Sequence, residues 1–504
     1  MDFLDPRKKR ALRHRLIAGY FLIGIAIGLV SLILIFQSYG YDLDRKTGAI
    51  IQNGLLFVSA SPEPADIYLN NELFKTQSNA RLVLPSAVYK LELKRSGYRP
   101  WQKTVSLAGG SIDRLVYPFL FPVKLDATDQ KTYPVAPTFA SQSPDRHWIL
   151  VQPADHPDQF DVFDTTDFTK PPTVITLTAG LLPTASQHHL QLVEWSTDNR
   201  HVLLKDTYAG GSQFIMVDRQ VPASSYNVNT TFKTSPTTVA LHDKKFDQLY
   251  LYDKAAQTLS LGLQSDASLK LVASHVLAFK SYGNDILMYA TDQEALTGQT
   301  RIVYQDKNGS FSLNQVVSGN QYLLNLAQYN GDWYVADGSA ADGRIYIYKN
   351  PQAIIEHPSG SSQLYPLTVL RVDNPTWMEF SANTQFLAVE SGSKFVVFDA
   401  ERGRNYRYSL PVSLDPASTD DGAAPHANWM DDGRLIVNSG GKMFVTDYDG
   451  LNQQTLTANL PGMPALFNRD YTLLYNMAPA VKTPGQFALT RTDLIATKAN
   501  QPKH

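Results

Sequence analysis

A unit of two apolar strands separated by polar turns recurs along the chain after Pro122. The copies lie at residues 143–167, 196–220, 243–257, 282–310, 329–352, 381–404, 430–450 and 467–494. Their turns recur every 38 to 53 residues, which is the period of propeller blades, where each four-stranded sheet buries its faces against its neighbours. The sequence therefore predicts a mainly β protein with a β-propeller over residues 123–496, of eight blades or alternatively seven.

Individual residues fit this pattern. The turn Asp431-Asp432-Gly433 allows the chain to reverse between strands, and the flanking Leu435 and Val437 are expected to pack between blades. Several units carry a tryptophan before the turn, and core packing explains these better than ligand binding: Trp195, Trp377 and Trp429.

Two segments of this region, "FVTDYDGLNQQTLTANLPGMPALFNRDYTLLY" and "SPDRHWILV", resemble TolB-type, WD40-like propeller repeats. The resemblance is strong at the two ends of the region, and the middle units have lost the signature. The last unit lacks a fourth strand. We expect a segment near Phe119–Leu125 to supply it, which would close the ring and hide both sheet edges.

A long apolar segment precedes the repeats. Residues Leu16–Phe36 carry no charge over 21 residues, and at about 1.5 Å each they span roughly one hydrocarbon core. Basic residues fill Arg7–Arg15, whereas only Arg45 and Lys46 follow closely. The positive-inside rule then places residues 1–15 in the cytoplasm and residues 37–504 outside the cytoplasmic membrane.

A cleavable signal peptide is the alternative to this transmembrane helix. No small-x-small cleavage signal follows, since "FQSYGYDLD" is bulky and polar. An uncleaved signal anchor is therefore favoured. Gly24 and Gly28 form a G-x-x-x-G pair, which allows two membrane helices to approach closely, and oligomerisation through it is a weak prediction.

After a linker at residues 37–53 the pattern alternates with period two. "ADIYLNNELF" predicts a hairpin that turns at Asn70-Asn71. In "AVYKLELKR" Tyr89, Leu91 and Leu93 share one face, and in "GYRPWQKTVSL" Trp101, Val105 and Leu107 do. Residues 54–122 are therefore predicted to form a small sandwich-like β domain.

The order "GLLFVSASPEPADIYLNNELF … LVLPSAVYKLELKRSGYRPWQKTVSL" resembles a PEGA domain over about residues 54–108. This chain has Pro64 and Asn71 at positions where the family usually has glycine. The resemblance implies a spacer or interaction module at a bacterial cell surface, with no catalytic residues to carry over.

Charge and composition exclude several classes. The formal net charge is −2, and a body without clustered basic residues is a poor nucleic-acid binder. The chain has no cysteine, which excludes disulfides, thiol catalysis and Cys-ligated metals.

No catalytic set, cofactor site or metal site is predicted. His188-His189 are adjacent, so they would point to opposite faces of a strand and are interpreted as surface histidines. The acidic segments at 418–422 and 447–450 fit turns, although weak Ca²⁺ binding stays open. "LAGGS" (107–111) and "YAGGS" (208–212) fit glycine-rich turns, and the N-x-[ST] sites at Asn229 and Asn308 are expected by chance.

These features predict a membrane-anchored, extracytoplasmic binding or scaffold protein of the bacterial cell envelope. The propeller is expected to bind an envelope protein or a cell-wall glycan at one end of the ring, where loops 290–300, 337–344 and 412–428 vary most in length. The alternative is a hydrolase or lyase acting on extracellular sugar or peptide, with two carboxylates about 5–10 Å apart and flanked by aromatic residues. Residues 497–504 are predicted to form a C-terminal tail.

Overall fold

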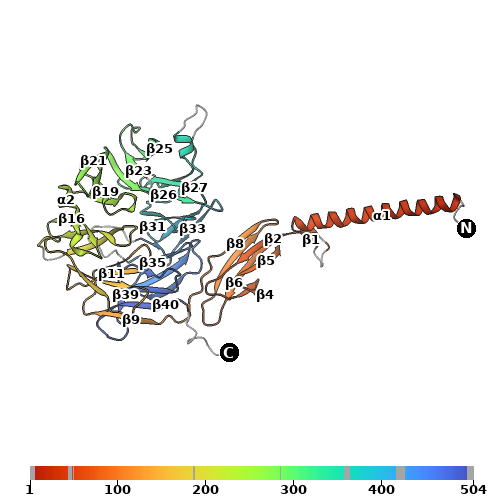
Figure 1. The fold of residues 1–504 in the computed structure, drawn as a ribbon, viewed down its shortest axis with the longest axis horizontal. Coiled ribbons are helices and arrows are strands. Elements are labelled where there is room, and N and C mark those ends of the chain that lie inside the picture. Colours follow the sequence, from red (N-terminus) through yellow and green to blue (C-terminus); the bar gives the residue numbers. More distant parts are fainter. Residues whose placement is uncertain are drawn as a thin grey trace. The chain divides into compact units, whose positions relative to one another are not determined.

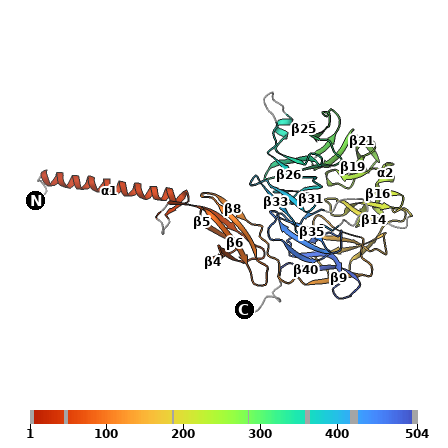
Figure 2. The same cartoon turned by 180° about the vertical axis from the view of Figure 1, so that it is seen from behind.

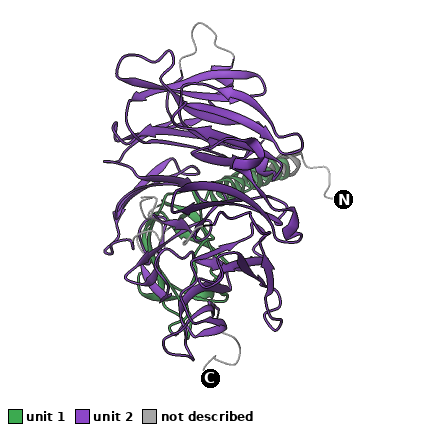
Figure 3. Ribbon diagram, turned by 90° about the vertical axis from the view of Figure 1, so that its left-hand side faces the viewer, with its two compact units in different colours: residues 1–123, 498–504 green, residues 124–497 purple. Residues whose placement is uncertain are grey.

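The computed structural model describes residues 6–43, 48, 50–184, 188–283, 285–356, 364–415 and 426–495. The chain divides into two compact units, coloured separately in Figure 3: unit 1 spans 1–123 with 498–504, and unit 2 spans 124–497. Each unit is described by itself.

Unit 1 begins with helix α1 (Pro6–Ser38). Its segment Leu12–Ser38 is long and apolar enough to cross a membrane, with a mean hydropathy of 2.6, and none of it is buried against the rest of the protein. The predicted apolar helix is confirmed.

The rest of unit 1 contains two four-stranded sheets, ordered β1-β2-β5 with β8 parallel to β2, and β4-β3-β6-β7. The strands are β1 (Tyr41–Leu43), β2 (Ile50–Val58), β3 (Asp66–Leu69), β4 (Glu72–Gln77), β5 (Ala80–Pro85), β6 (Ala87–Lys94), β7 (Trp101–Leu107) and β8 (Ile112–Leu115). The predicted inward residues of β6 and β7 behave as expected, since Leu91, Leu93 and Trp101 are at most 1% exposed.

The β3–β4 hairpin turns at the predicted asparagine pair. Asn70 and Asn71 have φ of 52° and 69°, the left-handed values that a two-residue turn of type I′ requires. The Asn70 side chain also accepts a hydrogen bond from the backbone Lys90 N at 2.9 Å, whereas Asn71 accepts only a longer, exposed one from Lys90 Nζ at 3.4 Å.

Replacing Asn71 by glycine should therefore stabilise this hairpin by up to about 1 kcal/mol, because glycine adopts positive φ without steric cost. Asn71→Ala is the matched variant and should destabilise it by about 1 kcal/mol. Hydrogen–deuterium exchange of the β3 and β4 amides measures both, and faster exchange in Asn71→Gly would contradict the argument.

Within the described residues, unit 2 contains eight four-stranded antiparallel sheets, seven of them built from consecutive strands (Figures 1 and 2). Sheets 1 to 4 consist of β10 (Phe139–Gln142), β11 (Trp148–Gln152), β12 (Gln159–Asp164) and β13 (Thr173–Thr176); β14 (His188–Trp195), β15 (His201–Tyr208), β16 (Gly211–Asp218) and β17 (Tyr226–Asn227); β18 (Thr238–Leu241), β19 (Gln248–Asp253), β20 (Thr258–Leu263) and β21 (Ser268–Ala273); and β22 (Val276–Ser281), β23 (Leu287–Thr291), β24 (Gln299–Asp306) and β25 (Gly309–Val317).

Sheets 5 to 8 follow in the same order along the chain. They consist of β26 (Tyr322–Tyr329), β27 (Asp332–Ser339), β28 (Arg344–Lys349) and β29 (Thr368–Arg371); β30 (Trp377–Phe380), β31 (Phe386–Ser391), β32 (Lys394–Asp399) and β33 (Arg404–Ser409); β34 (Asn428–Trp429), β35 (Arg434–Ser439), β36 (Lys442–Asp447) and β37 (Gln454–Ala458); and β38 (Leu466–Phe467), β39 (Leu473–Pro479), β40 (Phe487–Asp493) and β9 (Ala127–Tyr133). Short helices α2 (Val228–Phe232), α3 (Gln352–Ile355), η2 (Pro222–Ser224) and η3 (His242–Lys244) lie between strands.

Consecutive four-stranded sheets, the last of them completed by a strand from the start of the unit, give the β-propeller fold that the repeats predict. The predicted count of eight blades, or seven, additionally requires each sheet to take one place around a single ring, and it stays a prediction. The first strands of several successive sheets approach one another, so we call the first strands of the sheets the inner strands.

The closing strand differs from the predicted one. Residues Ala127–Tyr133, and not a segment near Phe119–Leu125, pair antiparallel with β40. Phe119 instead forms a bridge with Ser61 inside unit 1, where Leu120 and Phe121 are buried. These apolar residues belong to the core of the first domain, which explains why they are not available to the last sheet.

Candidate functional site

Two inner strands of unit 2 carry charged side chains that do not enter the core. On β30, Met378 and Phe380 are each 8% exposed, whereas the intervening Glu379 is exposed. Lys280 on β22 is likewise exposed. Because successive side chains on a strand point to opposite faces, Glu379 lies on the face of β30 turned away from the core residues.

The pKa of Glu379 shows that this carboxylate sits among protein atoms despite its access to solvent. Desolvation raises the pKa, and the nearby positive charges of Lys280, His426 and Lys244 oppose that rise. The pKa of Lys244 is lowered, chiefly by desolvation and also by the charge of Lys280, against the attraction of Glu379. Sheets 3, 4 and 6, with the segment that leads into sheet 7, thus bring charges of both signs together. We call Lys244, Lys280, Glu379 and His426 the inner charge cluster.

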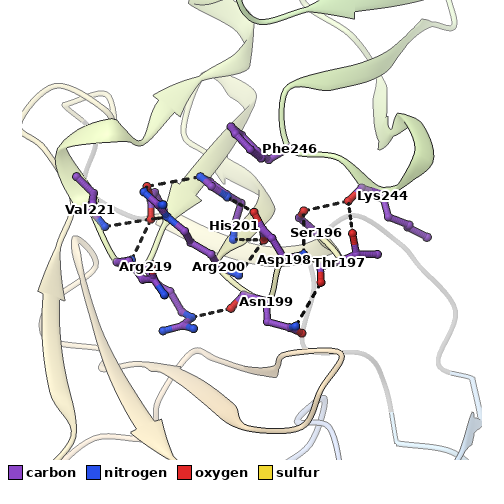
Figure 4. A network of polar contacts seen from close by, with 12 residues as sticks. Ser196, Thr197, Asp198, Asn199, Arg200, His201, Arg219, Val221, Lys244 and Phe246 are labelled. Atoms are coloured by element: carbon purple, nitrogen blue, oxygen red, sulfur yellow. Dashed lines mark hydrogen bonds and ion pairs between the residues drawn. The ribbon is translucent and has the colours of Figure 1, made fainter.

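Lys244 is also tied to sheet 2. Its ammonium group forms an ion pair with Glu194 of β14, and the other Glu194 oxygen accepts a hydrogen bond from Leu241 N at 2.9 Å. The Lys244 carbonyl accepts hydrogen bonds from Ser196 Oγ at 2.9 Å and Thr197 N at 3.1 Å. These contacts fix the backbone of Lys244 (Figure 4).

The turn that bonds to Lys244 is itself held by a polar network, drawn in Figure 4. Arg200 donates from Nε to Asp218 at 2.7 Å, and His201 stacks on Phe246 with ring centroids 3.8 Å apart. Although burial acts to raise it, hydrogen bonds from Arg200 and from backbone N–H groups lower the pKa of Asp218. The network keeps the β14–β15 turn in place, and its groups bond to one another.

Aromatic side chains lie beside the inner charge cluster. Trp377, at the start of β30, stacks on His426 with centroids 5.4 Å apart and an interplanar angle of 9°. Trp429 Nε1 donates to the Glu379 carbonyl at 3.1 Å. The core packing predicted for three tryptophans is observed for Trp195, which is 6% exposed, whereas Trp377 and Trp429 are only half-buried.

A group that could hold a metal ion lies where sheets 3 and 4 meet. One ligand atom each of His242, Asp243 and Asp285 lies within 4.8 Å of the others. His242 Nε2 is 2.8 Å from Asp285 Oδ1, and Asp285 N donates to Asp243 at 3.2 Å. Hydrogen bonding between the two sheets accounts for this arrangement without an ion. No metal motif in the sequence marks it, because Asp285 comes from a different sheet.

The histidine pair is not at the surface as predicted. The His188 side chain is 6% exposed, and its Nδ1 lies 3.0 Å from Asp206 Oδ2. His188 Nε2 bonds to the Pro183 carbonyl at 3.0 Å. Burial raises the pKa of Asp206, and its hydrogen bond with His188 opposes the rise. The buried carboxylate of Asp206, on the neighbouring strand, therefore holds the His188 side chain inside the protein by hydrogen bonding.

The other segments singled out in the sequence form turns or make hydrogen bonds within the fold. In 447–450, Asp447 accepts a hydrogen bond from Asn452 Nδ2 at 2.8 Å, and Gly450 has φ of +80° as a turn requires. The glycines of "YAGGS" form the β15–β16 turn, and a Cβ on Gly109 of "LAGGS" would meet Gln52 at 2.6 Å. Asn229 Oδ1 accepts from Phe214 N at 2.9 Å, and Asn308 Nδ2 donates to Glu356 at 2.9 Å. The acidic segment 418–422 lies outside the described residues.

Of the three segments predicted to be loops of a binding surface, the structure describes one as a loop, one mostly as strands and one only in part. Residues 292–298 do join β23 to β24, with Leu296 62% exposed. Most of 337–344 lies in β27 and β28, which leaves only residues 340–343 as a turn. Of 412–428, residues 416–425 lie outside the described part of the chain.

Comparison with known proteins identifies one domain. Residues 53–115 match the model of the PEGA domain, which confirms the resemblance drawn from the order of these segments. No curated protein matches the chain.

Solved structures resemble the chain only distantly. Hsv2 from Kluyveromyces lactis is 12% identical, with a TM-score of 0.38, over 65% of this chain and 99% of that one. The dihydro-heme d1 dehydrogenase NirN is 12% identical, with a TM-score of 0.40, over 64% and 67%. Oligogalacturonate lyase in complex with manganese is 11% identical, with a TM-score of 0.37, over 73% and 98%. Residues 53–115 of this chain are thus similar to the PEGA domain, and unit 2 has the β-propeller fold.

Proposed function

We propose that this chain is a membrane-anchored binding protein of the bacterial cell envelope, whose unit 2 binds an envelope protein or a cell-wall glycan outside the cytoplasmic membrane. Three features support the location: an apolar helix whose membrane-length segment is not buried against the rest of the protein, basic residues before it, and a PEGA domain after it. The basic residues favour the N-terminus inside.

The observation that carries the binding role is the stacking of Trp377 on His426, which is one of the residues of the inner charge cluster. A stacked aromatic surface beside charges of both signs suits a sugar ring with charged substituents or a peptide segment. The backbone carbonyl of Lys244 accepts hydrogen bonds from Ser196 and Thr197, and its ammonium group pairs with Glu194. Such preorganisation reduces the entropy lost on binding.

The test is retention of envelope components by the full-length chain in detergent, read out by mass spectrometry and glycan arrays. Trp377→Ala should weaken binding of the retained component about tenfold, equivalent to about 1.4 kcal/mol. Tyr365→Ala is the matched control, because Tyr365 is 69% exposed in unit 2 outside the inner strands, and it should bind as the parent does. Equal binding by Trp377→Ala would remove this site from the proposal.

The alternative, a hydrolase or lyase, has one observation in its favour. The carboxylates of Asp243 and Asp285 approach within 4.8 Å next to His242, near the separation of paired carboxyl groups in retaining glycosidases. Turnover of an envelope sugar or peptide that is lost in both Asp243→Asn and Asp285→Asn, yet kept in Trp377→Ala, would favour the enzyme.

A further inference from the structure

The chain reverses direction directly after α1. Tyr39 N donates to Ile35 O at 3.1 Å and Gly40 N to Gln37 O at 3.0 Å, which ends the helix. Gly40 has φ of +80°, and a Cβ there would lie 3.0 Å from Asn53 O. Asn53 N donates to Gly40 O at 2.7 Å. Gly40 therefore marks the point where the helix is fastened to β2.

From this point β1 pairs with the first residues of β2, next to the end of the helix. Tyr41 pairs with Gln52 and Leu43 with Ile50, whereas the core residues of β2 begin further along, at Leu56. Going from Tyr41 to Leu43 thus leads away from the core of the domain. The Tyr41 ring lies 5.4 Å from the Phe36 ring of α1, and Figures 1 and 2 both show β1 next to the end of the helix.

Four large side chains around this hairpin are apolar or aromatic and exposed, and the charged Asp42 lies between two of them. Tyr39 is 68% exposed, Tyr41 37%, Leu43 59% and Ile50 66%. We call these four residues the hairpin cluster. Such a group of large apolar side chains around one short hairpin usually marks an interaction surface.

We propose that the hairpin cluster lies in the lipid headgroup and upper acyl region of the same bilayer that α1 crosses. This rests on the membrane anchoring proposed above. The uncharged part of α1, Leu16–Phe36, has 21 residues, about 31 Å of helix against a hydrocarbon core of about 30 Å. The residues that follow Phe36 therefore lie at the interface, where tyrosine side chains are enriched.

The fold-back of β1 continues this contact. Since Tyr41 packs on Phe36 in the last turn of the helix, Leu43 and Ile50 would face the acyl chains. The bilayer would then contact unit 1 at the helix and at the hairpin, and the domain would be held at the membrane surface rather than swing on a single linker.

Site-directed spin labelling tests the proposal, because the chain has no cysteine. Single variants Leu43→Cys, Ile50→Cys, Leu29→Cys and Leu73→Cys of the full-length chain are labelled in vesicles of phosphatidylethanolamine and phosphatidylglycerol. Collision with lipid-soluble oxygen is compared with collision with a water-soluble nickel chelate. Leu29 in α1 and Leu73 on β4 are 56% and 61% exposed, so they serve as membrane and water references.

We expect the oxygen-to-nickel ratio at Leu43→Cys and Ile50→Cys to exceed that at Leu73→Cys several-fold and to approach that at Leu29→Cys. A lipid-like ratio at position 29 with water-like ratios at 43 and 50 overturns the hairpin proposal and leaves the anchor standing. Water-like ratios at all four positions overturn both.

Discussion

Replacing Asp161 by alanine should lower the free energy of unfolding of unit 2 by about 3 kcal/mol. Asp161 on β12 of the first sheet is 2% exposed. Its Oδ2 accepts from Lys131 Nζ at 2.7 Å and from Tyr133 Oη at 2.8 Å. Both donors belong to β9, which pairs with the last sheet. The variant leaves the buried Tyr133 hydroxyl without this acceptor and removes two of the contacts between the first and last sheets.

Urea unfolding of the full-length chain in detergent measures this loss. Asp161→Asn keeps an acceptor oxygen and should fall between the parent and the alanine variant. Asp167→Asn is the control, since its partner Lys170 is 74% exposed and exposed ion pairs contribute about 1 kcal/mol or less. If Asp161→Ala unfolds at the same urea concentration as Asp167→Asn, the contacts do not hold the closure.

The free energy of unfolding should contain a component that falls as the pH rises from about 4 to about 7 and that disappears in the double variant Glu390→Gln, Asp337→Asn. Burial raises the pKa of Glu390 to about 7 from 4.5, against a hydrogen bond from Ala427 N, and raises that of Asp337 to about 7 from 3.8. One oxygen of each carboxyl group is buried without a hydrogen-bond partner among the described residues, so little offsets the desolvation of the charge.

The sign follows from proton binding. Both groups hold their proton up to higher pH in the folded state than in the unfolded chain, so their contribution is fully present below the unfolded pKa and is lost as the pH rises through about 7. At 1.36 kcal/mol per pKa unit, Glu390 accounts for up to roughly 3 kcal/mol and Asp337 for up to roughly 4 kcal/mol. Urea midpoints of the parent and double variant at pH 4.5, 6 and 7.5 measure the difference.

Glu72→Gln, at an exposed position of β4, should leave the pH profile unchanged. Parallel profiles for the parent and the double variant would show that neither buried carboxyl group titrates in this range.

Much of unit 1 could be predicted because its signals are local. Alternation along β6 and β7 depends only on neighbouring residues, and the Asn70-Asn71 turn needs positive φ at adjacent positions. The closing strand could not be predicted in the same way. β9 has the sequence ATDQKTY, in which only Tyr133 is buried, and its pairing with β40 joins residues far apart in the chain, so no local period marks it.

The candidate site was missed for a related reason. Glu379 and Lys280 each stand as one exposed charge on an otherwise apolar strand, and only the packing of sheets 3, 4 and 6 sets them near Lys244. The surface position predicted for His188 followed from its being adjacent to His189, whereas its environment is set by Asp206 on β15.

The pairing of β9 with β40 also orders events during synthesis. Residues 127–133 leave the ribosome long before residues 487–492 are synthesised. Until then, the backbone N–H and C=O groups of β9 lack the partners that β40 later provides. A chain that stops short of β40 keeps that edge open, and an open edge pairs readily with other chains. Only the completed polypeptide can bury it, so premature termination near the C-terminus should yield aggregates rather than a slightly smaller propeller.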